Sequence, residues 1–181
     1  MIGGWQHSIS HPGIADLITV SAYFVAAVFT ALAAAHAPSS TRPQERSLWR
    51  AGTFALVALA LNEVLDLQTL LISVGRAEAK SGGWYDQRHN VEYVFAIVLG
   101  AALLAAGASI VRRLKHTHST VWVAFGGFVS IALFAMLRAS TILHLGLGNG
   151  ITTIIANLEN IGIFMVGAAA AIYTEAAAPT E

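Results

Sequence analysis

The sequence contains no cysteine and few charged residues, and each shortage excludes whole classes of protein. Without cysteine there can be no disulfide, thiolate metal ligand, iron–sulfur cluster or covalently attached c-type haem. Charged residues make up only 11% of the 181 residues, whereas a typical soluble domain has about 25%. No basic segment interleaved with aromatic residues is present, so nucleic acid is not an expected partner. These shortages indicate a protein embedded in lipid.

The sequence has instead five long apolar runs. A helix that crosses a bilayer needs roughly 20 mostly apolar residues. Runs of this length lie at about 14–36, 51–74, 91–112, 120–145 and 151–173. The connections between them are short and leave no room for a soluble catalytic domain. The sequence therefore predicts an all-α fold, in which residues 1–181 form one polytopic membrane bundle with five transmembrane helices.

The basic residues outside the apolar runs predict how the bundle is oriented. Three lie on one side, in the 75–90 connection, and six lie on the other side. The six are Arg42, Arg46, Arg50, Arg112, Arg113 and Lys115. Because the side with more Lys and Arg stays in the cytoplasm, we expect the N-terminus outside and the C-terminus in the cytoplasm. The expected location is the bacterial inner membrane, with the lipid bilayer as a partner.

Four ionisable residues fall inside the predicted spans at similar depth. Glu63 and Asp66 belong to the second span, Arg138 to the fourth and Glu159 to the fifth. Counted from the outer ends of the spans, they lie about 11–16 Å deep. Ionisable residues are costly in lipid, so this clustering predicts a functional site in the outer half of the bilayer. One Arg neutralises one of the three carboxyls, and at least one other is expected to be protonated or to bind a cation.

Other polar residues extend this predicted pocket. Those on the same spans, as candidate ligand-binding residues, are Asn62, Thr141, Asn157 and Asn160. The external loop carries Trp84 and Arg88, and it either covers the pocket as a lid or places Trp84 in an interfacial aromatic belt. The inner half of the bundle has no comparable set, and His118 is expected to be a solvated loop residue.

A metal site is a second interpretation of the same region. Four carboxylates and two histidines, the ligand set of di-iron helical bundles, are supplied by Glu63-x-x-Asp66, His89-x-x-Glu92, His144 and Glu159. The His-x-x-Glu order is reversed relative to those bundles, and the residues lie in two layers. A b-type haem held by His89 and His144 is disfavoured, because both histidines lie at the membrane edge. A metal ion thus remains the main cofactor candidate.

Several short motifs resemble a group of uncharacterised bacterial multi-spanning inner-membrane proteins. They are LDLQT at 65–69, GWYDQR at 83–88, RAS at 138–140 and LE at 158–159. The resemblance covers most of the chain from the second span onward. It implies a membrane fold and carries no activity with it.

These patterns predict a polar pocket that handles protons, a cation or a polar headgroup such as that of a quinone. In this hypothesis Glu63 and Asp66 carry protons, Arg138 supplies the fixed counter-charge and Glu159 is the second acid. One alternative is a non-catalytic subunit of a larger membrane complex, in which the polar layer fixes the register of the helices. A second alternative is a membrane-embedded metal enzyme. The sequence leaves open whether the protein is an enzyme.

Overall fold

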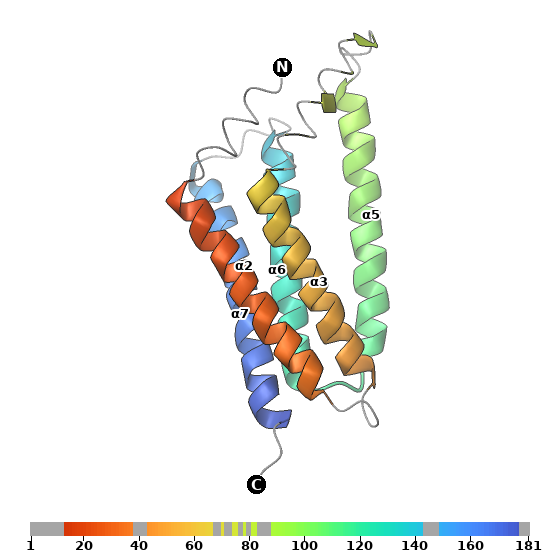
Figure 1. Cartoon of the computed structure of the whole chain (residues 1–181). Coiled ribbons are helices and arrows are strands. Elements are labelled where there is room, and N and C mark those ends of the chain that lie inside the picture. Colours follow the sequence, from red (N-terminus) through yellow and green to blue (C-terminus); the bar gives the residue numbers. More distant parts are fainter. Residues whose placement is uncertain are drawn as a thin grey trace.

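In the computed structural model the described residues form five helices (Figure 1), which confirms that the fold is all-α. The structure describes residues 13–37, 43–66, 88–142 and 149–177, and in addition residues 70, 74, 75, 78, 81 and 82. The helices are α2 (Ile14–His36), α3 (Pro43–Leu65), α5 (Arg88–Leu114), α6 (Ser119–Ile142) and α7 (Asn149–Ala177).

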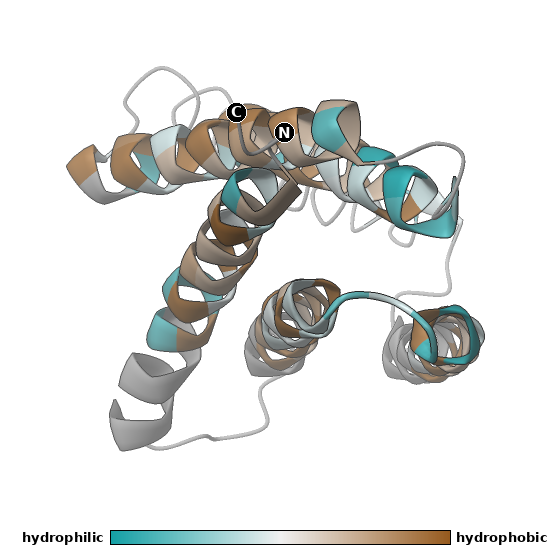
Figure 2. Ribbon diagram, turned by 90° about the horizontal axis from the view of Figure 1, so that it is seen from below, coloured by the Kyte–Doolittle hydropathy of each residue, from teal (hydrophilic) through white to brown (hydrophobic). Residues whose placement is uncertain are grey.

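Four of these helices are long and apolar enough to cross a membrane. Within the described residues the spanning stretches are Asp16–His36, Pro43–Leu65, Ser119–Leu137 and Asn157–Ala177. Large apolar side chains such as Phe54 and Phe164 point outward and are exposed, and hydrophobic residues cover much of the helices (Figure 2). Outward-facing apolar side chains on helices of this length are typical of a membrane protein. The predicted fifth span, about 91–112, falls in α5, and its membrane crossing stays a prediction.

The boundaries of α3 depart most from those expected from the sequence. This helix begins at Pro43 rather than at 51, and it ends at Leu65 rather than at 74. Proline suits the first turn of a helix because the N–H that it lacks has no intrahelical partner there. Asp66 follows with a φ of 43°, a left-handed conformation that commonly ends α-helices. Arg46 therefore lies within the helix, not in a connection.

The helices pack through small residues. α2 lies against α3 and α7, and α7 lies against α6. At the closest approach of α6 and α7, a Cβ atom added to Gly127 would lie 2.7 Å from the carbonyl oxygen of Gly162, and the reverse distance is also 2.7 Å. Two helix backbones can approach this closely only where side chains are absent.

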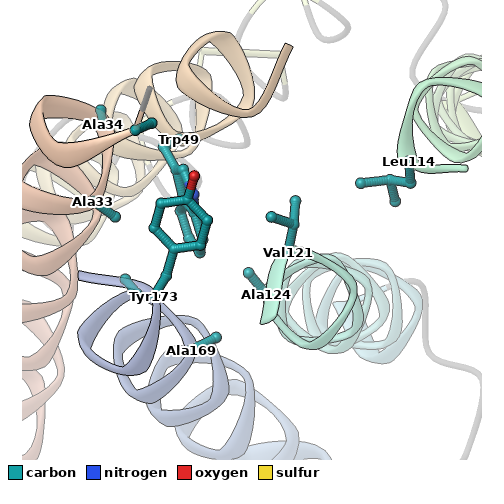
Figure 3. Packing of buried hydrophobic residues seen from close by; sticks show 10 residues of the cluster. Ala33, Ala34, Trp49, Leu114, Val121, Ala124, Ala169 and Tyr173 are labelled. Atoms are coloured by element: carbon teal, nitrogen blue, oxygen red, sulfur yellow. The ribbon is translucent and has the colours of Figure 1, made fainter. Parts of the chain in front are cut away.

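Buried side chains form two clusters along the bundle. One surrounds Tyr23, Leu56 and Val166 in the middle of the helices. The other joins Trp49 and Tyr173 to α2, α5 and α6 at the end where α3 and α6 begin (Figure 3). α5 contributes to the second cluster and otherwise makes few contacts with the other helices (Figure 1).

Candidate functional site

Among the predicted site residues whose side chains the structure describes, Glu159 is the most deeply buried. Its side chain is 8% exposed, and its Oε1 atom accepts a hydrogen bond of 2.8 Å from the hydroxyl of Tyr23. Tyr23 is itself buried and belongs to α2, so this pair joins α2 to α7. The neighbouring predicted residues Asn157 and Asn160 have exposed side chains. Of these three, only Glu159 is turned into the bundle.

Glu63 and Asn62 lie in the last turn of α3, and both side chains are half-buried. Ala60, one turn earlier on the face of Glu63, is fully buried. The inward face of α3 therefore continues to Glu63. The depth expected for Glu63 and Asp66 was counted along an unbroken helix to 74, and that count does not apply to a helix that ends at Leu65.

The remaining predicted site residues lie outside the described side chains. They are Trp84, Arg88, His89, Glu92, Arg138, Thr141 and His144. The expected ion pair of Arg138 with one of the three acids therefore stays a prediction, as does the lid. Among the side chains that the structure does describe, no three His, Asp or Glu residues are grouped so that they could hold a metal ion.

A second polar cluster lies at the opposite end of the bundle, where the sequence predicted none. Glu45 is 1% exposed. Its Oε1 atom accepts a hydrogen bond of 2.7 Å from the backbone N–H of His118, and its Oε2 atom accepts one of 2.6 Å from the hydroxyl of Tyr173. One carboxyl group thus joins the start of α3, the turn before α6 and the end of α7. The expectation that His118 is a solvated loop residue was wrong: its side chain is half-buried, and its Nδ1 atom lies 2.9 Å from the hydroxyl of Thr120.

Aromatic rings surround the Glu45 carboxyl. The rings of Trp49 and Tyr173 have centroids 5.3 Å apart, and the His118 ring meets Tyr173 edge-on at 5.9 Å. In Figure 3 the indole nitrogen of Trp49 and the hydroxyl of Tyr173 lie at the same end of the ring pair. Trp49 is 2% exposed, and its Nε1 atom has no hydrogen-bond partner among the residues that the structure describes.

The sequence does contain a signal for this cluster. Pro43 marks a helix start, which places Glu45 in the first turn of α3. Trp49 follows four residues later on the same face of the helix. The signal was missed because Arg42, Arg46 and Arg50 made the segment resemble a solvated basic connection.

Hydroxyl side chains also join the helices. Thr53 of α3 donates a hydrogen bond of 3.0 Å to the hydroxyl of Thr30 in α2. Ser130 of α6 donates one of 2.8 Å to the carbonyl oxygen of Leu158 in α7. Such contacts are ordinary in membrane bundles, where each typically contributes about 0.6 kcal/mol. They need no functional explanation.

No family model, curated protein or solved structure matches this chain. The likeness of LDLQT and GWYDQR to multi-spanning membrane proteins therefore remains a resemblance. The function of this protein has to be inferred from its own residues.

Proposed function

We propose that the protein is an integral membrane protein whose intramembrane polar pocket handles protons, a cation or the polar headgroup of a quinone-like molecule. In this proposal Glu159 is the central acid, Glu63 and Asp66 are the further carboxyls, and Arg138 is the counter-charge. The proposal includes a topology of five membrane spans in the bacterial inner membrane, with the N-terminus outside.

The hydrogen bond between Tyr23 and Glu159 is the observation that carries the proposal. Glu159 lies about 15 Å along α7 from the start of that helix, and Tyr23 lies about 13 Å along α2 from its start. A carboxyl group at such a depth is costly for a membrane protein and is a functional-site hypothesis by default. Where a polar side chain only has to fix the register of two helices, Asn, Ser or Thr is sufficient. This chain uses Ser130 in that way between α6 and α7.

The chemistry of the pair favours proton handling among the three options. A protonated carboxyl can donate its proton, and a carboxylate can accept one from water or from a quinol hydroxyl. The Tyr23 hydroxyl orients the Glu159 carboxyl by donating to Oε1, which leaves the geometry of the acid fixed while its charge changes.

The test compares Glu159→Gln with Glu175→Gln, since Glu175 lies on the same helix with an exposed side chain. Purified full-length protein is placed in vesicles containing a pH-sensitive dye, and proton entry is followed after a potassium diffusion potential is applied. In parallel, binding of a short-tailed quinone is measured by calorimetry. We expect Glu159→Gln to abolish proton entry or quinone binding and Glu175→Gln to retain it. The proposal is wrong if the unmodified protein does neither, or if both variants behave alike.

A second candidate is a non-catalytic subunit of a larger membrane complex. The cluster at Glu45 favours it, because there a buried carboxyl group joins three segments and so has an evident structural role. If Glu159 does the same between α2 and α7, Glu159→Gln will lower stability without changing any transport or binding.

The metal-enzyme alternative rests on His89, Glu92 and His144. Metal analysis and an absorption spectrum of the purified protein test it together with the disfavoured b-type haem. A stoichiometric metal that is lost in His144→Ala would favour this alternative over both of the others.

A further inference from the structure

One face of α5 is directed toward the other helices. Its members are spaced three and four residues apart, which places them on one side of a helix. They are Gly100, Leu103, Gly107, Ile110 and Leu114. Leu114 is 1% exposed and belongs to the cluster around Trp49 and Tyr173, against which Ile110 also packs. α5 is therefore anchored to the bundle at its C-terminal end.

Above this anchor the same face is open. Leu103 is 38% exposed, and a Cβ atom added to Gly107 would meet no heavy atom within 4 Å. The six residues 101–106 are all exposed. Because six consecutive residues point in every direction around an α-helix, the side of α5 that faces the bundle is uncovered there. Figure 1 shows α5 standing apart, and in Figure 2 the short connection at 115–118 bridges the two separated helices.

The open stretch is bounded at both ends. A Cβ atom added to Gly100 would lie 3.3 Å from the terminal methyl of Met136, so α5 approaches α6 again at this level. The anchor at Ile110 and Leu114 closes the other end. Between Gly100 and Ile110 an α-helix rises about 15 Å. An opening of this length, closed above and below, admits a flexible chain and excludes a helix about 10 Å wide that runs alongside α5.

Positive charge surrounds the anchored end. Arg112, Arg113 and Lys115 are exposed where α5 ends, and Arg50 is exposed near the start of α3. Of the acids in that region, Glu45 is turned inward and buried by its bonds to His118 and Tyr173, whereas Glu175 near the end of α7 is exposed. Basic residues at the end of a long apolar helix attract anionic lipid headgroups.

We propose that the space between α5 and the bundle binds one anionic phospholipid. An acyl chain lies beside Leu103 and Gly107, and the phosphate is held by Arg113 and Lys115, which lie on either side of Leu114 in the sequence and about 9–12 Å farther along the helix axis than Gly107. The apolar opening accounts for the chain and the basic end accounts for the headgroup. This site is separate from the Glu159 pocket and does not depend on it.

The experiment counts the lipids that stay bound to the purified full-length protein in detergent. The protein is incubated with equal amounts of phosphatidylglycerol and phosphatidylcholine, and native mass spectrometry measures the retained molecules. We expect one phosphatidylglycerol per chain to be preferred. Arg113→Gln with Lys115→Gln should lower that preference roughly tenfold, because each cation near a membrane surface contributes several-fold to anionic lipid binding.

A pair of tryptophan variants tests the opening itself. Gly107→Trp fills the space beside α5 and should remove the retained lipid, whereas Ala105→Trp adds the same ring on the opposite side and should leave it. Equal retention of the two lipids by the unmodified protein overturns the proposal, and so does retention by Gly107→Trp. A dimer that is lost in Gly107→Trp overturns it as well, because a second copy of the chain would then occupy the opening.

Discussion

The hydroxyl of Tyr173 lies 2.6 Å from Oε2 of Glu45, which joins the end of α7 to the first turn of α3. Because Oε1 of the same carboxyl accepts the backbone N–H of His118, both oxygens are used to hold different segments. A buried carboxyl with two donors is stable where it lies, and removal of either donor exposes the cost of its burial. Substitutions at the end of the bundle near Trp49 therefore test how much these hydrogen bonds contribute to holding the helices together.

Tyr173→Phe should lower the free energy of unfolding by about 1.5–3 kcal/mol, since a hydrogen bond to a carboxyl that is 1% exposed is lost without loss of the ring. Unfolding of the purified protein by a denaturing detergent measures the change. Thr174→Val is the neighbouring control, because among the described residues the Thr174 hydroxyl bonds to the carbonyl of Ala170 in its own helix and to no other helix. A Tyr173→Phe, Glu45→Gln double-mutant cycle with no coupling would contradict the contact.

Gly127→Ala should destabilise the protein by roughly 1–3 kcal/mol through a clash between helix backbones. The added Cβ would lie 2.7 Å from the carbonyl oxygen of Gly162, so α6 and α7 must separate. The matched control is Gly107→Ala, where the Cβ meets nothing and the better helix propensity of alanine should leave stability unchanged or slightly higher. A loss of stability in Gly127→Ala that is absent in Gly107→Ala supports the close approach of α6 and α7, and equal losses in the two variants contradict it.

Arg46→Gln should destabilise the end of α2. The guanidinium donates from Nε to the carbonyl of Ala34 at 3.1 Å and from Nη2 to that of Ala35 at 3.3 Å, where the helix has carbonyls without intrahelical partners. Loss of the two bonds should cost about 1–2 kcal/mol. Arg50 lies on α3, as Arg46 does, and its side chain is exposed. Arg50→Gln therefore serves as the control and should change stability by less than about 0.5 kcal/mol. Hydrogen exchange localised to α2 would show where the loss occurs.

The topology prediction places Glu181 in the cytoplasm and Trp84 outside, because six basic residues oppose three. Reporter enzymes fused after Glu181 should be active only if they function in the cytoplasm. Labelling of a cysteine introduced at Trp84 by a membrane-impermeant reagent gives the independent measurement, and the chain has no other cysteine to react. A reporter that is active only outside the cytoplasm would reverse the orientation.

Sequence reasoning succeeded where apolar runs are long and end cleanly. α2 begins and ends where the run 14–36 does, and α6 and α7 differ from their predicted bounds by a few residues. It failed at α3 because the first two turns of that helix are polar and basic, while the apolar run continues beyond Leu65. The break at Asp66 depends on a positive φ, which Asp tolerates and apolar periodicity does not reveal.

The candidate site was predictable only in part, for a related reason. Depth along the apolar run at about 151–173 made Glu159 a candidate, and its side chain is buried. Glu45 escaped because it lies outside the apolar run, and its burial depends on His118 and Tyr173 from distant parts of the chain. Partners that tertiary packing supplies are absent from local patterns.

The separation of Glu45 and Tyr173 by 128 residues sets an order of events during synthesis. The first turn of α3 leaves the ribosome early, and Tyr173 is made only after α5, α6 and most of α7. Until then the Tyr173 hydroxyl is not available to Oε2 of Glu45. The contact between the start of α3 and the end of α7 can therefore form only after nearly all of α7 has been made.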